Sequence, residues 1–561
     1  MNSPRRGTAV RGLPSPPTAF ERRSFLKLLG VGAGALLVAP RLSGANSPAL
    51  PAPRSLGRAL QLAGECSLAW LDPQHEHFPW GGYEVAHDVG RWWNALPRLE
   101  AATGFVIPPP LEAAMLHNFW RLTKNEDALL LNDPEIEALR GKKDRINLHN
   151  LREGLLAYAA LAHYRRNAWA RERGRVLVRT MAAGLLPNGG LDTSKLKSLS
   201  RISLSPDKIQ IQPTDPNAWY DCTGSTGRTL EAVVVFHDVT GETESWELAG
   251  RLAAILDRNL LTDDGSVHPG IVAPTNIGHD HSYQGALRGL LLYGLRSGQT
   301  RLVERVHATF RHGVLRTLVS ESGWSPHDLG TLRFPNGDGD PLAETGSCSD
   351  AVQLGLWLGL HTGHVECLDD VERLIRTRIL PEQITESEDP RQRGGWGVHR
   401  EPHGRSSTFD VFAAVLATLV DVQQAAVEAR GPATWVHFNL ALETPLARIQ
   451  ERRTDRTAHV QVTATRRGDL YVRVPGWAPR ESVRVTVEGK ARPPRFTGAY
   501  LHLASGNDRT GATVEISYDL PHRETVETMP VSGKKFTLTW RGDEVTACTP
   551  PVAIWPAAAV P

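Results

Sequence analysis

The chain has 561 residues, a formal net charge of +2, 41% hydrophobic residues and 22% charged residues. This length allows about two to four domains, and the composition is that of an ordinary globular protein. The sequence contains no basic block, which argues against a nucleic-acid partner. Its 5 cysteines are scattered, odd in number and without a Cys-x-x-Cys pair, which argues against a disulfide framework and against a structural zinc site of the usual spacing.

The N-terminal residues predict an export signal. Arg22 and Arg23 precede a Phe-Leu-Lys segment and an apolar run that ends at Pro40. The twin arginine is typical of the twin-arginine (Tat) pathway, and the apolar run is too short to span a bilayer. We therefore expect a signal peptide over 1–45, with cleavage after Ala45. This predicts the Tat export machinery as a partner, a periplasmic or extracellular location and no stable membrane anchor.

The middle of the chain predicts helices. Residues 46–60 are rich in small and polar residues and predict a linker, and helical periodicity then dominates from 61 to 430. Several predicted helices are followed by a Thr-Gly or Ser-Gly pair, which is typical of a helix C-cap. These pairs end at Gly104, Gly241, Gly298 and Gly363. Together with a last inner helix over 408–424, the spacing leaves room for about six helical hairpins. We therefore predict a mostly α protein with an (α/α)6 toroid over 61–430.

The C-terminal part changes period. Apolar and polar residues alternate over short runs, which predicts half-buried antiparallel strands. These runs cover 459–463, 470–474, 483–487, 514–518 and 536–540. The sequence therefore predicts a C-terminal antiparallel β-sandwich over 431–561.

Two loop segments carry candidate catalytic carboxylates. Asp328 lies in Ser-Pro-His-Asp-Leu-Gly and Glu344 in Ala-Glu-Thr-Gly-Ser-Cys, and both segments follow predicted helices. Hydrolysis of a glycosidic bond generally needs a pair of carboxyl groups in one pocket. The sequence also has 15 tryptophans and 9 tyrosines. Because tryptophan faces stack on sugar rings, this ratio favours a carbohydrate substrate, although core packing explains any single tryptophan as well.

Histidines and one arginine are candidate substrate contacts. His279 and His281 flank Asp280 at the start of an apolar helix, where polar side chains can bind sugar hydroxyls. A His-x-His metal pair is the alternative, but the sequence marks no third ligand. Arg228 follows a polar, glycine-rich segment that either binds an anion or simply begins a helix. Trp80 is either a sugar platform or a core residue.

The loop motifs resemble those of the β-L-arabinofuranosidase family of glycoside hydrolases, collinearly over roughly 80–540. The segment that contains His87 resembles the family's Gly-His-x-x-Gly helix start, and Ile-Gly-His-Asp-His at 277–281 resembles its Asn-x-His segment. Gly-Trp-Ser-Pro-His-Asp at 323–328 resembles its acid loop, with Asp328 in place of Glu. Ala-Glu-Thr-Gly-Ser-Cys at 343–348 resembles its Glu-Thr-Cys, with two residues inserted.

The resemblance implies a toroid followed by a sandwich, and it implies roles for the loop residues. Asp328 takes the place of the general acid, and Trp324 would help to raise its pKa. Glu344 would be the second carboxylate, and Asp410 stands where the family's nucleophile lies. Each has a structural alternative: a turn cap for Asp328, a salt bridge for Glu344 and a helix cap for Asp410.

The zinc site of the family does not carry over. Its enzymes hold zinc with a Glu, the Cys of Glu-Thr-Cys and a Cys-Cys pair, one Cys of which is the nucleophile. Here 404–410 contains no cysteine, and Cys348 alone cannot supply three thiolates. We therefore predict no cofactor and no metal ligands, with zinc disfavoured.

Three functional hypotheses follow from the sequence. The first is an exported glycoside hydrolase that acts on a plant or microbial glycan through two carboxylates. The second is a toroidal polysaccharide lyase with His281, Tyr283 and Arg228 around a uronate. The third is a non-catalytic member of the fold that only binds carbohydrate. A lyase alone makes unsaturated products that absorb in the near ultraviolet.

Overall fold

The computed structural model describes residues 55–556 except 140–148, 188, 199–226, 275–276, 333 and 505–512. The predicted signal peptide and Cys222 lie outside these residues. The predicted linker ends too late, because helix α2 (Leu56–Ala69) begins inside it, with Ser55 Oγ accepting a hydrogen bond from Arg58 N–H at 3.2 Å. Among the helices of the described part, none has the length and apolarity needed to cross a membrane.

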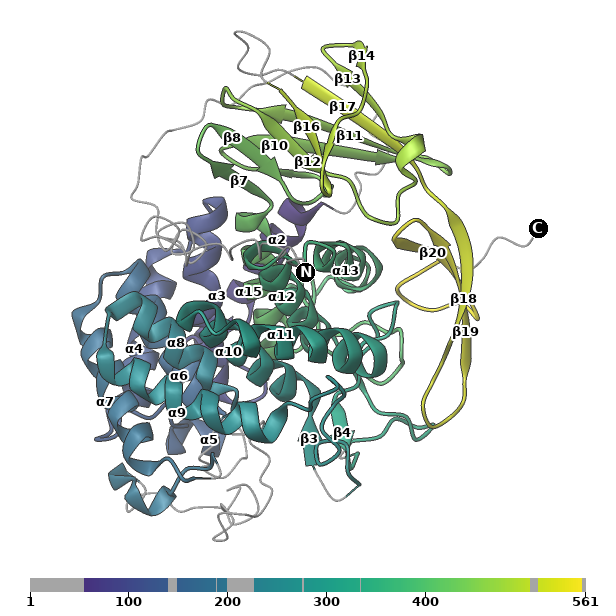
Figure 1. Cartoon of the computed structure of the whole chain (residues 1–561). Helices are drawn as coiled ribbons and strands as arrows, with labels where there is room; N and C mark the ends of the chain where they lie inside the picture. Colours follow the sequence, from purple (N-terminus) through teal and green to yellow (C-terminus); the bar gives the residue numbers. More distant parts are fainter. Residues whose placement is uncertain are drawn as a thin grey trace, which may run out of the picture. The chain divides into compact units, whose positions relative to one another are not determined.

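Helices packed in a closed ring form the centre of the protein (Figure 1). Within the described residues, each inner helix contacts the next one in the chain, and α15 contacts α3, which closes the ring. These inner helices are α3 (Val85–Thr103), α6 (Asn150–Tyr164), α8 (Thr229–Thr240), α10 (Asp280–Ser297), α12 (Thr345–His361) and α15 (Phe409–Ala425). They are covered on both sides: every residue from Thr345 to Gly359 in α12 is buried.

Outer helices alternate with the inner ones along the chain. They are α2, α4 (Pro109–Thr123), α7 (Ala168–Gly184), α9 (Thr243–Leu260), α11 (Thr300–Ala308) with the π-helix η5 (Thr309–Leu318), and α13 (Cys367–Leu374) with the π-helix η6 (Ile375–Ile379) and α14 (Leu380–Glu382). The short helix α5 (Pro134–Leu139) lies between α4 and α6. This alternation confirms the predicted (α/α)6 toroid.

Glycine ends three of the helices as the sequence predicts. Gly104, Gly241 and Gly298 are C-caps in the left-handed conformation, with φ of 75°, 73° and 70°, where only glycine avoids a Cβ penalty. Gly363 differs, because α12 ends at the extended residue Thr362 instead.

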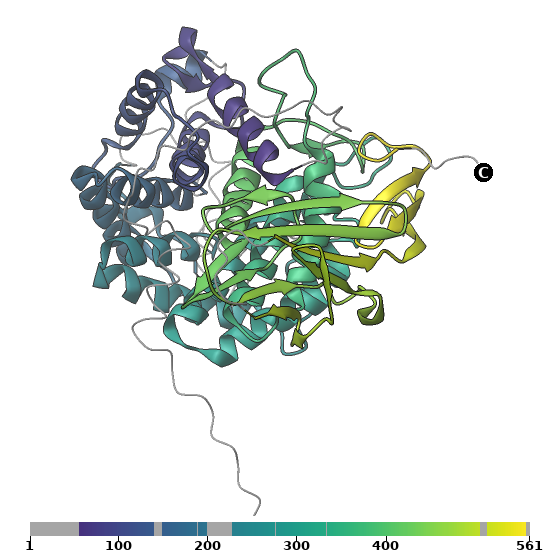
Figure 2. The same cartoon turned by 90° about the horizontal axis from the view of Figure 1, so that it is seen from above.

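Two β-sheets form the predicted sandwich, which begins at β7 rather than at 431. The six-stranded sheet has the order β14-β13-β17-β11-β10-β9, and the five-stranded sheet has the order β15-β16-β12-β8-β7. All pairs are antiparallel except β12 with β8, which are parallel. The sheet strands run side by side in Figure 2. Their bounds are β7 (Val427–Arg430), β8 (Ala433–Val436), β9 (Leu442–Glu443), β10 (Ala447–Arg453), β11 (Thr457–Ala464), β12 (Leu470–Arg473), β13 (Arg484–Val487), β14 (Lys490–Arg492), β15 (Phe496–Thr497), β16 (Tyr500–Leu503) and β17 (Thr513–Asp519).

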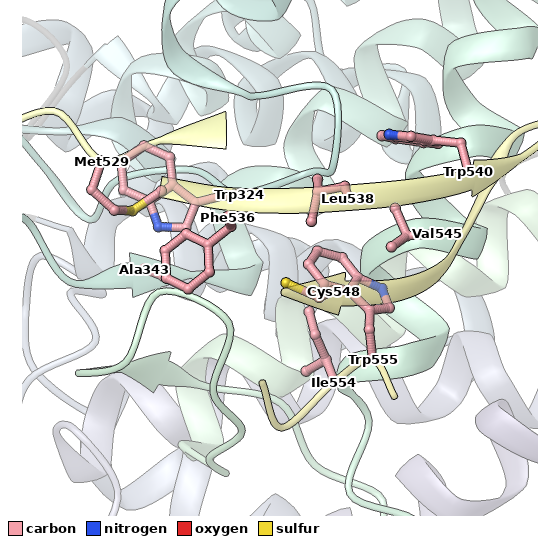
Figure 3. Close-up of a cluster of buried hydrophobic side chains, with 10 residues drawn as sticks. All are labelled: Trp324, Ala343, Met529, Phe536, Leu538, Trp540, Val545, Cys548, Ile554 and Trp555. Carbon is pink, nitrogen blue, oxygen red and sulfur yellow. The ribbon is translucent and has the colours of Figure 1, made fainter. Parts of the chain in front are cut away.

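The last predicted sandwich strand belongs to another sheet. β18 (His522–Thr528), β19 (Lys535–Arg541) and β20 (Glu544–Thr549) form a separate three-stranded antiparallel sheet. Phe536, Leu538 and Trp540 of β19 do alternate into a core, but this core is shared with Trp324 and Ala343 from the loops of the toroid (Figure 3). Alternation predicts a strand with one buried face, but not the element against which that face packs.

Buried ion pairs join the three parts of the chain. Arg473 on β12 pairs with Glu372 on α13. Arg376 on η6 pairs with Glu451 on β10 at 2.8 Å, and Arg453 on β10 pairs with Asp543, before β20, at 2.7 Å. Charges held in this way fix the orientation of the parts, because a buried charge without its partner is costly.

Candidate active site at the N-terminal ends of the inner helices

The candidate site lies where the inner helices begin. Because inner and outer helices alternate along the chain, the inner helices share one direction and their N-terminal ends meet at one end of the ring. His279 is the N-cap of α10, Glu344 is the N-cap of α12, and Asp410 is the second residue of α15. The fold therefore brings residues that are far apart in sequence to the same end of the toroid.

Short strand pairings hold the loops of this end together. β3 (Ile277–His279) pairs with β4 (Asp328–Gly330), and β5 (Ala343–Glu344) pairs with β6 (Val398–His399). Between them, an isolated bridge joins Pro326 to Ala343. The segments that carry the predicted carboxylates are thus part of one hydrogen-bonded framework.

His279, His327 and Glu344 form a cluster, here called the His–Glu cluster. One ligand atom of each residue lies within 4.8 Å of the others. His279 Nε2 is 2.8 Å from Glu344 Oε2, and the rings of His279 and His327 have centroids 4.6 Å apart. Glu344 is buried, whereas both histidines are half-buried. The cluster therefore combines a protected carboxylate with two imidazoles that are partly open to solvent.

Asp328 is turned toward one of these imidazoles. Its Oδ1 lies 2.9 Å from His327 Nδ1, and its Oδ2 accepts a hydrogen bond from the Phe334 N–H at 3.4 Å. The side chain is 1% exposed. A buried carboxylate that contacts an imidazole fixes the tautomer and the orientation of the ring. This arrangement suits a residue that positions His327 better than one that meets the leaving oxygen of a substrate.

Asp410 is half-buried at the start of α15. Burial raises the pKa of its carboxyl; the charge of Arg91 opposes this shift, and the charge of Glu344 adds to it. A carboxyl with a raised pKa keeps its proton more readily than an ordinary carboxyl and can donate it during a reaction. Asp410 therefore has the properties expected of a proton donor.

His281 lies in a buried network rather than at an open surface. Its Nδ1 is 2.5 Å from Asp350 Oδ2, and its Nε2 is 2.8 Å from an Arg91 guanidinium nitrogen. Burial, followed by the charges of Arg91 and Arg228, lowers the pKa of His281 well below its usual range. The imidazole is therefore neutral, with Nδ1–H donating to Asp350 and Nε2 accepting from Arg91. Protein groups occupy both nitrogens that would contact a sugar.

His87 and Arg228 belong to the same network. His87 Nδ1 is 3.0 Å from Asn150 Oδ1, and its Nε2 accepts from Arg91 Nε at 3.3 Å. Arg228 pairs with Glu153 at 2.8 Å and donates to Ser282 Oγ at 3.3 Å. Both side chains are buried. In this structure the predicted substrate contacts His281, His87 and Arg228 hold one another and the inner helices in place.

The two tryptophans singled out in the sequence have different surroundings. Trp324 is 8% exposed and packs in the core under the three-stranded sheet with Phe536 and Met529 (Figure 3). Because the three-stranded sheet covers it, its ring has no open face for stacking. Trp80 is half-buried, and one face of its indole stacks on the His75 ring, with centroids 3.5 Å apart.

The thiolate zinc site implied by the resemblance does not fit this structure. Cys348 is buried, and a Cβ atom on Gly323 would lie 3.2 Å from its sulfur. Burial raises the pKa of the Cys348 thiol to about 12, which disfavours the thiolate that zinc would need there. Donors of another kind, the imidazoles and carboxylate of the His–Glu cluster, are the ones that this end of the toroid brings together.

Sequence reasoning missed several residues of this end. No role was predicted for His327 from the sequence, although it lies in the Ser-Pro-His-Asp-Leu-Gly segment. Arg91, Glu153, Asp350 and Arg288 were not singled out either. Glu153 accepts from Arg152 at 2.9 Å and from Arg228 at 2.8 Å, and Arg288 lies 2.5 Å from Asp350. A signal was present, because charged residues inside otherwise apolar inner helices are costly unless they are paired.

Comparisons with known proteins agree with the architecture. No family model and no curated protein sequence matches the chain. Solved structures do match. A GH127 β-L-arabinofuranosidase from Geobacillus stearothermophilus T6 is 13% identical, with a TM-score of 0.52 over 88% of this chain and 80% of that one. A structure described as a glycoside hydrolase is 15% identical, with a TM-score of 0.55 over 87% and 80% of the two chains. A further GH127 β-arabinofuranosidase is 13% identical, with a TM-score of 0.54 over 87% and 81%. The chain therefore has the fold of the GH127 β-L-arabinofuranosidase type of glycoside hydrolase.

Proposed function

We propose that the protein is a glycoside hydrolase whose active site is the end of the toroid that carries Glu344 and Asp410. The observation that supports this most directly is the convergence of these two carboxylates, from the beginnings of α12 and α15, beside the histidines of the His–Glu cluster. A pair of carboxyl groups with different protonation states is what hydrolysis of a glycosidic bond needs. The similar fold of known glycoside hydrolases is consistent with this proposal.

In the proposed reaction Asp410 is the general acid. Its raised pKa favours the protonated form, which can donate a proton to the leaving glycosidic oxygen. Glu344 is the second carboxylate, which accepts a proton from the attacking water or attacks the sugar itself. Asp328, which the sequence suggested as the acid, instead orients His327. The half-buried imidazoles of His279 and His327 would bind sugar hydroxyls.

The lyase hypothesis receives less support. It needs His281, Tyr283 and Arg228 to surround the carboxylate of a uronate, and all three side chains are buried within the wall of the ring. The non-catalytic hypothesis differs from the proposed function only in turnover, and activity measurements separate the two.

A panel of plant and microbial glycans tests the proposal. The panel includes β-L-arabinofuranosides, because two of the similar structures are named for that activity. We expect new reducing ends and no near-ultraviolet absorbance from unsaturated sugars. Asp410→Asn should lower turnover by on the order of 10²–10⁴-fold, whereas the exposed control Asp519→Asn should retain it. Unsaturated products, or full activity of Asp410→Asn, would overturn the proposal.

We also propose that the protein is exported by the twin-arginine pathway. The support is Arg22-Arg23 followed by an apolar run of signal-peptide length. Replacing both arginines with lysine should leave the precursor in the cytoplasm, and fractionation of cells that express each form measures this. Normal export of the lysine variant would contradict the proposal.

A further inference from the structure

We infer that the His–Glu cluster binds one divalent transition-metal ion, with zinc as the ion that its donors suit best. His279, His327 and Glu344 offer two imidazole nitrogens and a carboxylate oxygen within 4.8 Å of one another. The inference rests on the proposed function, because it gives Glu344 a second role in the same site. It replaces the expectation of a metal-free protein, which was based on the missing thiolates and on the lack of a marked third ligand beside His279 and His281.

The three donors come from separate segments that backbone hydrogen bonds tie together. His327 N–H donates to Leu342 O at 2.7 Å, and Glu344 N–H donates to Ser325 O at 3.1 Å. His279 lies opposite Asp328 in the β3–β4 pairing. The cluster therefore does not depend on flexible side chains that meet by chance on the surface. Its backbone is fixed before an ion arrives, which lowers the entropic cost of binding.

Each histidine has a polar partner at its Nδ1 nitrogen. His279 Nδ1 is 3.1 Å from Ser282 Oγ, and His327 Nδ1 is 2.9 Å from Asp328 Oδ1. Metal-binding histidines almost always use one nitrogen for the ion and give the other N–H to a carboxylate, carbonyl or water. With Nδ1 as the donor to these partners, Nε2 is the ligand atom of both rings. The Asp328–His327 contact thus has the form of a carboxylate–histidine–metal triad.

The donor set selects the class of ion. Imidazole nitrogens suit zinc, copper, iron and nickel, whereas calcium and magnesium prefer oxygen donors alone. Two histidines and one glutamate also form the protein part of known catalytic zinc sites, in which a fourth position stays open. Zinc bonds of about 2.0–2.2 Å place neighbouring tetrahedral donors roughly 3.4 Å apart. The 2.8 Å between His279 Nε2 and Glu344 Oε2 needs only a small separation to reach this value.

An ion in this place would deepen the proposed reaction. A divalent ion supplies Lewis acidity, which makes a nearby water or sugar hydroxyl more acidic. Asp410 would still donate the proton to the leaving oxygen, and Asp328 would still hold the ring of His327. The ion would take the Nε2 atoms of His279 and His327, so sugar hydroxyls would meet the ion in place of these imidazoles. The thiolate site of the resembling family plays no part, since 404–410 contains no cysteine and Cys348 alone cannot supply three thiolates.

The experiment must separate this cluster from two other groups of possible ligands. One of them, His307 with Glu366 and Cys367, depends on a buried thiol, and burial raises the pKa of Cys367 to about 12, which disfavours the thiolate. Glu304, His307 and His364 also bring ligand atoms within 4.8 Å of one another. Their histidine rings stack in parallel, with centroids 3.5 Å apart, so their nitrogens point alongside each other rather than toward one ion. The full chain with His364→Ala is therefore the reference protein for all metal measurements.

Metal content after purification without chelator is the first measurement. We expect about one zinc per chain in the His364→Ala reference, and near-stoichiometric loss in His327→Gln and in Glu344→Gln on that background. Titration of chelator-stripped protein with Zn²⁺, and the visible spectrum of the Co²⁺ form, measure binding without any substrate. Asp328→Asn should weaken Zn²⁺ binding on the order of 10–100-fold. Circular dichroism of each variant confirms that it is folded.

Three results would overturn the inference. They are no Zn²⁺ binding by the folded reference protein, binding that survives in both His327→Gln and Glu344→Gln, and loss of all binding through His364→Ala alone. Failure of the inference is distinguishable from failure of the proposed function. A folded chain that hydrolyses glycans but binds no Zn²⁺ removes the ion and keeps the hydrolase, whereas a chain that binds Zn²⁺ but has no turnover removes the hydrolase and keeps the ion.

Discussion

Asp350 and His281 form a buried pair between two inner helices, with Asp350 Oδ2 2.5 Å from His281 Nδ1. The other oxygen of Asp350 lies 2.5 Å from Arg288, which also pairs with Glu231. Through His281, the same aspartate connects to Arg91 on α3. Asp350 on α12 therefore contacts two residues of α10, His281 and Arg288. These residues in turn contact Arg91 on α3 and Glu231 on α8.

Asp350→Asn should destabilise the protein strongly. The change leaves the charge of Arg288 less compensated in a buried setting, and loss of one partner of a buried ion pair costs about 3–5 kcal/mol. Urea unfolding followed by circular dichroism measures the decrease. The exposed pair Arg179–Glu244 provides the control, since Glu244→Gln should cost at most about 1 kcal/mol. Equal effects of the two substitutions would contradict the structural role of the network.

A close approach of backbones leads to the second prediction. A Cβ on Gly289 in α10 would lie 2.8 Å from Glu231 N and 2.9 Å from Leu230 Cβ in α8. Alanine gains about 1 kcal/mol of helix propensity, but the clash with a neighbouring backbone costs about 1–3 kcal/mol. We therefore expect Gly289→Ala to decrease the free energy of unfolding. Gly57→Ala, with no atom within 4 Å of its Cβ, should increase it by about 0.5–1 kcal/mol. The same sign in both variants would argue against tight packing of the inner helices.

The regular part of the fold could be predicted because its signals are local. The helical spacing of apolar residues predicts α6 and α10, and the bounds it gives differ from the observed ones by at most three residues at either end. Glycines mark the ends of α3, α8 and α10. The site could be predicted only in part. Glu344 and Asp410 do lie at the beginnings of inner helices, but the partner of Asp328 and the surroundings of Trp324 depend on segments distant in sequence. Phe536 shares a core with Trp324 although more than two hundred residues separate them, and no local pattern contains that information.

Trp324 should therefore be a structural residue. Trp324→Ala removes a large side chain from the core shared with Phe536, and such truncations cost about 3–5 kcal/mol. Thermal and urea unfolding measure this loss, and Trp120→Ala, at an exposed position of α4, should change stability by about 0.5 kcal/mol or less. For the folded Trp324→Ala protein we expect an unchanged KM. A raised KM without loss of stability would restore Trp324 as a sugar platform.

The last prediction concerns pH and the contact between β7 and β8. Burial alone would raise the pKa of Glu428, but the nearby imidazole of His437 and the charge of Arg430 lower it from 4.5 to about 2. His437 Nε2 is 3.5 Å from Glu428 Oε2, and its Nδ1 is 2.7 Å from the Tyr500 hydroxyl oxygen. A carboxylate with a depressed pKa stabilises the folded state above its unfolded pKa.

Glu428→Gln should therefore lower stability in a pH-dependent way. The unfolded chain binds the proton of Glu428 first as the pH falls, so the stabilisation is fully present above pH 4.5 and disappears as the pH falls toward about 2. The difference in unfolding free energy between the wild type and Glu428→Gln should be largest at pH 7 and should approach zero near pH 2. Glu481→Gln, at an exposed position, should show no such trend. A difference that stays constant over this range would mean that the carboxylate charge of Glu428 does not stabilise the sandwich, and that only its packing does.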